Sequence, residues 1–226
     1  DKICQHYGDI RNKREFNDFV QEVKPDFLIH LAAQALVLTS YREPFETMTT
    51  NIVGTAVVCE AVMNIDWNCT CVLITSDKAY DNVEWIWGYR ETDGIGGKDI
   101  YSGSKGAAEL VIKSYWHSFI KKMPNIKFGV ARAGNVIGGG DWALDRIIPD
   151  CIKALESGAA IDIRSPKAIR PWQHVLEPLS GYMLLAQKMW SDPTRYCEGW
   201  NFGPRAESIS TVWDVATEVV NNYGSG

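Results

Sequence analysis

Up to residue 135, apolar positions alternate between helical spacing and short apolar runs. Phe16, Phe19 and Val23 recur at the spacing of a helix that Pro25 ends, which predicts a helix over residues 12–24. Apolar runs predict strands at 26–33, 70–75 and 126–132, and broader apolar patterns predict helices at 51–64 and 101–121. Strands separated by helices indicate βαβ crossovers, so we expect an α/β fold whose parallel sheet has helices on both faces.

Beyond Gly138 the pattern loosens. Helices are expected near residues 145–157, 176–190 and 210–222, and short strands are expected between them. This region is therefore expected to form a smaller lobe that is interleaved with the sheet domain and is not an independent repeat.

Composition narrows the classes of protein to consider. The 226 residues are 46% hydrophobic, enough for one sizeable core. A net charge of −5 without any Lys/Arg run argues against nucleic acid and membrane surfaces as partners. The longest apolar stretch, 27–38, is far shorter than the ~20 residues of a membrane span. Six cysteines without a CxxC pair argue against a metal site and predict reduced thiols in a cytoplasmic protein.

Each predicted strand runs into small or polar residues. The first leads into Ala32-Ala33-Gln34, the second into Thr75-Ser76-Asp77-Lys78, and the third into Ala133-Gly134-Asn135. Ligands of open parallel sheets bind outside the carboxyl ends of the strands, so a shared cleft is expected there. Any one of these segments taken alone also fits an ordinary polar loop.

Tyr101 and Lys105 are the clearest candidates for chemistry. They are four residues apart at the start of a predicted helix and so share one face. An ammonium beside a phenol lowers the phenol pKa, which provides a general base for a sugar or alcohol hydroxyl. The preceding Gly96-Gly97 and the small residues of YSGSK permit close approach. Thr75 to Lys78 combine hydroxyl, carboxylate and amine, although a helix cap or turn also explains them.

Five longer blocks carry a resemblance to a known family: TSDKAYDNVEWIWGYRE, YSGSK, RAGNVIGGGDWALDRIIPD, IRPWQHVLEPLSGY and EGWNFGP. They resemble the nucleotide-sugar dehydratases of the extended short-chain dehydrogenase/reductase group, specifically the CDP-glucose 4,6-dehydratase type of lyase. The resemblance implies a Rossmann-type NAD domain at 1–135 and 172–191 and a nucleotide-sugar lobe at 136–171 and 192–226. It also implies a homodimer formed by helices 51–64 and 101–121. The implied reaction converts CDP-glucose to CDP-4-keto-6-deoxyglucose by internal hydride transfer, in cytoplasmic deoxysugar and lipopolysaccharide biosynthesis.

The resemblance also assigns catalytic roles. Tyr101 resembles the base that takes the C4 hydroxyl proton, and Lys105 its partner, which also binds the nicotinamide ribose. Ser76 resembles the hydroxyl that binds the C4 oxygen. Asp77 and Lys78 resemble the acid–base pair that expels water across C5 and C6, although related thymidine-type enzymes carry a glutamate in place of Lys78.

Binding residues are carried over in the same way. Cofactor contacts are expected from Asp9, Ile10, Leu31, Ala32, Ala33, Asn51, Thr75, Tyr101, Lys105 and Arg132. Substrate contacts are expected from Gln34, Asn135, Arg146, Arg170 and His174, the arginines because their planar fork suits a diphosphate. Simpler readings remain for several of them: a turn residue for Asp9, plain packing for the alanines, a solvated head for Arg146 and a core histidine for His174.

Two departures from the family pattern stand out. No GxxGxxG loop occurs, so the chain is expected to be an internal fragment that is inactive by itself. Ala35 and Leu38 stand where the family usually has proline and arginine. Two other functions stay open: a nucleotide-sugar epimerase, which shares YxxxK but lacks the Asp77-Lys78 pair, and a non-catalytic dimerising fragment.

Overall fold

The computed structural model describes residues 3–205 and 209–224. The chain forms two compact units, 1–132 with 182–201 and 133–181 with 202–226. The expected boundaries were 135/136, 171/172 and 191/192. The last of them lies further along the chain because a strand near residue 200 joins the sheet of the first unit. The assignment of cofactor to one unit and sugar nucleotide to the other stays a prediction.

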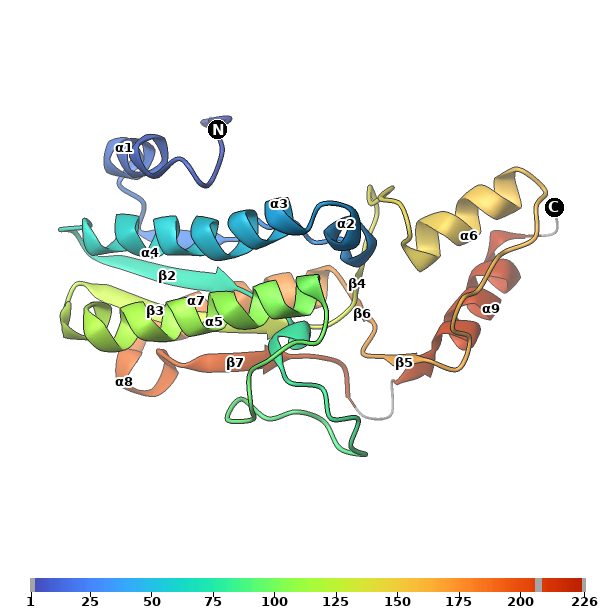
Figure 1. Ribbon diagram of the computed structural model, residues 1–226. Helices are drawn as coiled ribbons and strands as arrows, with labels where there is room; N and C mark the ends of the chain where they lie inside the picture. The colour runs from blue at the N-terminus through green and yellow to red at the C-terminus, as the bar shows by residue number, and fades with distance from the viewer. Residues whose placement is uncertain (1–2, 206–208, 225–226) are drawn as a thin grey trace. The chain divides into compact units, whose positions relative to one another are not determined.

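The main sheet has four strands in the order β1-β2-β3-β7. Figure 1 labels three of them, β2, β3 and β7. They are β1 (Phe27–His30), β2 (Cys69–Ile74), β3 (Ile126–Ala133) and β7 (Gly199–Phe202). β1 pairs in parallel with β2, and β2 in parallel with β3, so that Leu28 lies opposite Cys71 and Cys71 opposite Phe128. The predicted parallel sheet is confirmed. β1 is shorter than the expected 26–33, and residues 31–33 follow it as a loop.

Helices cover both faces of this sheet, as predicted. On one face lie α4 (Gly54–Met63) and α5 (Ile100–Ser118), drawn side by side in Figure 1, and α1 (Lys13–Val23) packs against α4. On the other face α7 (Leu176–Ser191) places Met189 against Gly129 of β3. Successive strand residues point to opposite faces, so Phe128 meets the α4 and α5 side while Gly129 meets α7.

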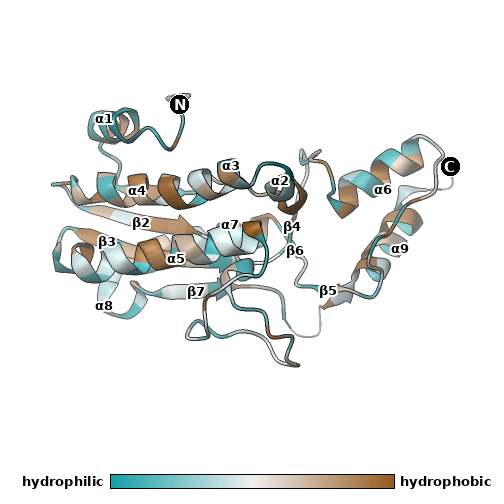
Figure 2. Ribbon diagram, viewed as in Figure 1, coloured by the Kyte–Doolittle hydropathy of each residue, from teal (hydrophilic) through white to brown (hydrophobic). Residues whose placement is uncertain are grey.

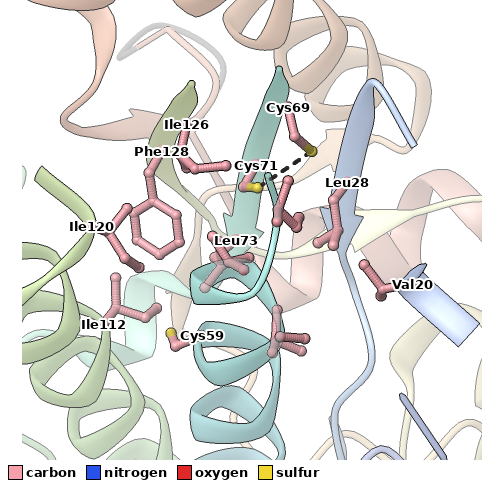
Figure 3. Close-up of a cluster of buried hydrophobic side chains, with 14 of the residues drawn as sticks. Val20, Leu28, Cys59, Cys69, Cys71, Leu73, Ile112, Ile120, Ile126 and Phe128 are labelled. Carbon is pink, nitrogen blue, oxygen red and sulfur yellow. Dashed lines mark hydrogen bonds between the residues drawn. The ribbon is translucent and has the colours of Figure 1, made fainter. Parts of the chain in front are cut away.

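The core lies between the sheet and the α4–α5 face (Figure 3). Val58 and Val62 of α4 are fully buried there with Leu73 of β2, and each such side chain contributes roughly 1.5–3 kcal/mol. Cys69 and Cys71 face the same side, their Sγ atoms 3.7 Å apart, and both are free thiols, as expected. Figure 2 shows the brown hydrophobic bands of α4 against the mostly hydrophilic α1, whose Val20 alone is buried.

Several short elements of the first unit were not predicted from the sequence. They are α2 (Val37–Arg42), α3 (Pro44–Met48), a π-helical turn (Thr49–Val53), 3₁₀ turns at Asp77–Ala79 and Ile120–Lys122, and α8 (Pro193–Tyr196). Helix α3 and the π-helical turn run directly into α4, so the expected helix at 51–64 is the end of a longer helical stretch. No helix among residues 3–205 and 209–224 is long and apolar enough to cross a membrane.

The second unit contains two small sheets and two helices that pack together. β4 (Val136–Ile137) pairs in parallel with β6 (Gln173–His174), and β5 (Ile169–Arg170) pairs antiparallel with β8 (Ser210–Thr211). The helices are α6 (Ile147–Glu156) and α9 (Val212–Tyr223). With α7, they confirm the three helices predicted after residue 138.

Glycines let the loop before α5 lie directly on that helix. A Cβ atom at Gly106 would lie 2.4 Å from the carbonyl oxygen of Gly96 and 3.4 Å from that of Ala79. A Cβ atom at Gly103, one turn earlier, would have its nearest neighbour at 3.8 Å. The close approach expected from Gly96-Gly97 and YSGSK is therefore present, and at Gly106 it excludes any side chain.

These contacts predict opposite effects for two substitutions on one helix. Gly106→Ala should lower the free energy of unfolding by roughly 1–3 kcal/mol, because the backbone must move to admit the methyl group. Gly103→Ala should raise it by roughly 0.5–1 kcal/mol, because the helix propensity gain meets no clash. Urea unfolding of both variants measures the difference. Equal stabilities would show that the loop does not press on α5 at Gly106.

Candidate active site

Tyr101 and Lys105 lie on the first two turns of α5. Asp99 caps this helix, accepting hydrogen bonds from the backbone nitrogen and the hydroxyl of Ser102 at 3.0 and 2.6 Å. The cap fixes where the helix begins, and hence the direction of the residues that follow. Tyr101 is 8% exposed and Lys105 7% exposed. Two polar side chains are thus held in a largely dry environment at the end of the sheet.

Lys105 is a buried cation. Burial lowers its pKa to about 8, and the carboxylate of Glu109, one turn later, opposes that shift. Burial and the charge of Lys105 together lower the pKa of His30, the last residue of β1, to about 4. Within the described residues, Lys105 Nζ makes no hydrogen bond or ion pair, so its N–H groups are available to a ligand.

Ser76, Asp77 and Lys78 form a compact group at the end of β2. The Ser76 hydroxyl accepts a hydrogen bond from the Lys78 nitrogen at 3.2 Å and donates one to Asp77 Oδ1 at 3.0 Å. Lys78 Nζ lies 2.9 Å from Asp77 Oδ2. Ser76 therefore caps the 3₁₀ turn, as the simpler reading expected, and the same turn pairs a carboxylate with an ammonium. Both charged side chains are about one-third exposed, at 31% and 36%.

The 3₁₀ turn Asp77–Ala79 packs against α5. The structure therefore brings together the two groups that the sequence singled out independently, Tyr101 with Lys105 and Ser76 with Asp77 and Lys78. One group offers a phenol and a cation, and the other offers a hydroxyl, an acid and an amine. Together they have the functional groups for oxidising an alcohol and eliminating water from a neighbouring carbon.

Asn51 ties the loop after β1 to α5. Its side chain is 2% exposed, accepts from the Gln34 nitrogen at 2.9 Å and donates to the Gln34 oxygen and to Ser104 Oγ at 3.1 and 2.8 Å. The Gln34 amide is engaged internally as well, donating to Thr47 Oγ1 at 2.7 Å. Leu31 and Ala32, between this clamp and β1, are exposed, and Ala33 is half-buried.

Asp9, one of the expected cofactor contacts, forms an exposed ion pair. Asp9 accepts two hydrogen bonds from Arg11 Nε, at 2.9 and 3.1 Å, and this pairing lowers the Asp9 pKa to about 2. Arg11 also reaches Glu46 at 2.7 Å. Ile10 packs on the start of α4, where a Cβ atom at Gly54 would lie 2.8 Å from its side chain. Asp9 is thus a turn residue on the surface, and its carboxylate is already paired with Arg11.

Arg132 belongs to a buried network that the sequence analysis missed. Its guanidinium makes a bidentate ion pair with Glu109, at 2.8 and 2.9 Å, and donates to the hydroxyl of Tyr80 at 2.8 Å. Thr75 Oγ1 donates to Glu109 at 2.5 Å. Both Thr75 and Arg132 were expected as cofactor contacts, but their side chains form hydrogen bonds with other side chains of the protein. The one available signal for Glu109 was its spacing of four residues after Lys105.

The remaining expected substrate residues belong to the second unit. The Asn135 oxygen accepts from the Gln173 nitrogen at 3.0 Å, which continues the β4–β6 pairing. His174 is exposed in β6, and its Nδ1 accepts from the Leu176 nitrogen. Arg146 precedes α6, and Arg170 donates to the neighbouring Ile169 oxygen. Their roles as substrate contacts stay predictions. Among the residues that the structure describes, no cluster of His, Cys, Asp or Glu suits a metal ion.

Comparisons with known proteins identify the family to which the chain is similar. Residues 1–202 match the family model described as GDP-mannose 4,6 dehydratase. A CDP-glucose 4,6-dehydratase of Salmonella typhimurium is 47% identical over 99% of this chain, and the chain spans 64% of that protein. A dTDP-glucose 4,6-dehydratase of Streptomyces venezuelae, solved with NAD bound, superposes with a TM-score of 0.81 at 19% identity, covering 97% of this chain and 63% of that one.

A UDP-glucuronic acid 4-epimerase of Bacillus cereus gives a TM-score of 0.80 at 20% identity, covering 97% of this chain and 65% of that one. At these identities the two solved structures show the fold alone. They support the expected Rossmann-type architecture, and the fold itself is shared by dehydratases and epimerases.

The buried His30 predicts a specific loss of stability in acid. Because its pKa falls from 6.5 to about 4 on folding, the unfolded state binds the proton more tightly. Stability is therefore intact above pH 6.5 and falls by about 3 kcal/mol as the pH drops to 4. His30→Gln should remove this part of the pH dependence in denaturant unfolding, whereas His117→Gln, on the exposed side of α5, should keep it. Parallel pH profiles for wild type and His30→Gln would contradict the burial of a neutral imidazole.

Proposed function

The chain belongs to the GDP-mannose 4,6 dehydratase family, and on that premise we propose that it carries the catalytic residues of an NAD-dependent CDP-glucose 4,6-dehydratase. The nucleotide is suggested by the 47% identity to the Salmonella typhimurium enzyme. The observation that carries the reaction type is the Asp77–Lys78 ion pair on a turn packed against the helix of Tyr101 and Lys105. Of the protein's side chains, an oxidation at C4 with NAD as hydride acceptor would need only Tyr101 and Lys105 of the helix, and the ion pair suits the elimination that follows.

The residues fit a nicotinamide cofactor at one clear point. The buried ammonium of Lys105 can donate hydrogen bonds to a ligand, and ribose hydroxyls are suitable acceptors. The exposed backbone of Leu31 and Ala32, at the carboxyl end of β1, is open to a ligand on the same side. Bound NAD supplies the acceptor for the C4 hydride and later its donor to C6.

In the first stage Tyr101 acts as general base on the C4 hydroxyl. Lys105, as a cation, stabilises the phenolate form of Tyr101, which is the form that can accept the proton. With a pKa of about 8, Lys105 is mostly protonated at neutral pH. The Ser76 hydroxyl is buried next to this pair's helix and can bind the C4 oxygen as its charge changes.

In the second stage the elimination pair removes water across C5 and C6. A carbonyl at C4 makes the C5 proton acidic, because the negative charge can be delocalised as an enolate. Asp77 and Lys78 meet as carboxylate and ammonium, which favours Asp77 as the acceptor of the C5 proton and Lys78 as the donor to the departing hydroxyl. An epimerase on this fold has no use for such a pair, which is why the dehydratase is preferred.

Further parts of the assignment rest on family membership. We propose a homodimer through α4 and α5, for which the exposed apolar residues Val53, Leu110 and Phe119 provide a surface. We also propose a cytoplasmic enzyme of deoxysugar and lipopolysaccharide synthesis. Substrate contacts from Gln34, Asn135, Arg146, Arg170 and His174 belong to the same proposal.

Rapid mixing of the intact protein with CDP-glucose separates the two stages. Tyr101→Phe should lower turnover by ~10²–10⁴ and show no NADH absorbance, because the first proton transfer fails. Asp77→Asn and Lys78→Ala should accumulate NADH without 6-deoxy product, because only the elimination fails. Lys113→Ala, exposed on the same helix, serves as control. Normal product formation by all three site variants would refute the assignment, and an epimer in place of the 6-deoxy product would point to the epimerase.

The proposed dimer has its own test. Light scattering at micromolar concentration should give twice the mass of the protomer. Leu110→Glu should shift the mass toward the monomer, because it puts a charge into the α4–α5 surface. Leu144→Glu is the matched control, since Leu144 is as exposed but lies in the second unit. A monomeric wild type, or equal dissociation of both variants, would count against this interface.

A further inference from the structure

Glu109 is a buried and fully hydrogen-bonded side chain near the candidate site. Its exposed fraction is 5%, and its carboxylate accepts from Thr75 Oγ1 at 2.5 Å and from Arg132 at 2.8 and 2.9 Å. Thr75 directly precedes Ser76, so the carboxylate holds the end of β2 from which the elimination pair extends. Glu109 also lies on α5 one turn after Lys105, on the same helix face. One carboxylate therefore contacts one half of the site and adjoins the other.

Lys105 has few charged neighbours besides Glu109. Tyr101 precedes it on α5, His30 approaches from the end of β1, and Asp77 and Lys78 lie on the turn packed against α5. Among the other elements packed against α5, α3 and α4 carry Glu46 and Glu60, which are paired with Arg11 and Lys13, and α2 carries Tyr41 and Arg42 on its exposed side. Arg132 of β3 stands behind Glu109 as its counter-ion. Glu109 is thus the anion that acts on the buried ammonium.

We propose that Glu109 is a positioning residue that couples the two halves of the site: its carboxylate keeps Lys105 in the cationic form and at the same time anchors Thr75, which places Ser76, Asp77 and Lys78. The proposal deepens the proposed function and rests on it, because the cationic Lys105 matters for catalysis only if Tyr101 is the base. Arg132 supports the arrangement by holding Glu109 ionised and oriented, as two-point binding of a carboxylate by a guanidinium does.

The sign of the effect follows from electrostatics. Burial alone disfavours the ammonium form, and the nearby anion partly restores it. Glu109→Gln keeps the size of the side chain but removes the negative charge and leaves the positive charge of Arg132 uncompensated. Both changes lower the pKa of Lys105. The alkaline limb of the pH–rate profile, where Lys105 loses its proton, should therefore move to lower pH.

The test is a direct titration of Lys105 in the intact protein, with lysine labelled with carbon-13 at Cε and observed by NMR. The wild-type signal, assigned with Lys105→Arg, should titrate near pH 8. In Glu109→Gln it should titrate about one unit lower or more, and in Glu109→Asp, which keeps the charge, within about half a unit of wild type. Equal titration of wild type and Glu109→Gln would overturn the proposal.

Two further variants separate electrostatics from mere bracing. Thr75→Val removes the anchoring hydroxyl and keeps the charge, so it should leave the Lys105 titration in place while lowering kcat about tenfold, because the elimination pair is less well placed. Ser114→Ala, at an exposed hydroxyl of the same helix, should change neither quantity. If Glu109 only braces the fold, Glu109→Gln and Thr75→Val will both lower kcat and neither will move the titration.

The proposal can still be tested if Glu109→Gln fails to fold. If Glu109→Gln is unstable because Arg132 is left as a buried unpaired charge, the double variant Glu109→Gln with Arg132→Met removes both charges. Its Lys105 should still titrate below the wild-type value, because the anion adjacent to the ammonium is gone. An unchanged titration in the folded double variant contradicts the proposal. A shifted titration in a protein that converts no nucleotide sugar would keep the Glu109–Lys105 relation and refute the proposed function instead.

Discussion

The bidentate ion pair between Glu109 and Arg132 is the interaction on which the functional end of the first unit depends. It joins α5 to β3, and through Thr75 it joins both to the end of β2. Both charges are buried, so each needs the other, and removing one partner of such a pair typically costs about 3–5 kcal/mol. This contact therefore fixes the position of α5, which carries Tyr101 and Lys105, relative to the end of β2, which leads into Ser76, Asp77 and Lys78.

Burial has a second consequence at the same place. Burial lowers the pKa values of both Lys105 and His30 because the surroundings penalise a positive charge, and the charge of Lys105 lowers the pKa of His30 further. A chain selected only for stability would place an apolar residue at these positions. Perturbed titrating groups at the carboxyl end of a parallel sheet are typical of functional sites, and here the cost in stability accompanies a pKa close to the working range of an enzyme.

The fold does not distinguish the reactions that it supports. Dehydratases and epimerases superpose on this chain with nearly equal TM-scores, so the choice between them rests on the side chains at the end of β2. The Ser76-capped turn illustrates how the choice is made. The hydrogen bonds of Ser76 cap the turn that follows the strand, and the same turn sets Asp77 beside Lys78, so the cap and the proposed elimination pair share one arrangement.

The sequence alone determined what depends on local pattern. Periodicity located α1, α4, α5 and the parallel strands β1 to β3, because apolar spacing reflects which side of each element is buried. Spacing within one helix also made Tyr101 and Lys105 candidates, whereas Ser76, Asp77 and Lys78 needed the family resemblance, because a cap or turn explains them equally well. Only the tertiary structure decided how Thr75 and Arg132 are used, that Glu109 receives both of them, and that residues near 200 complete the sheet. Glu109 lies 34 residues from Thr75 and 23 residues from Arg132 along the chain, and no local pattern encodes which buried polar groups will satisfy one another.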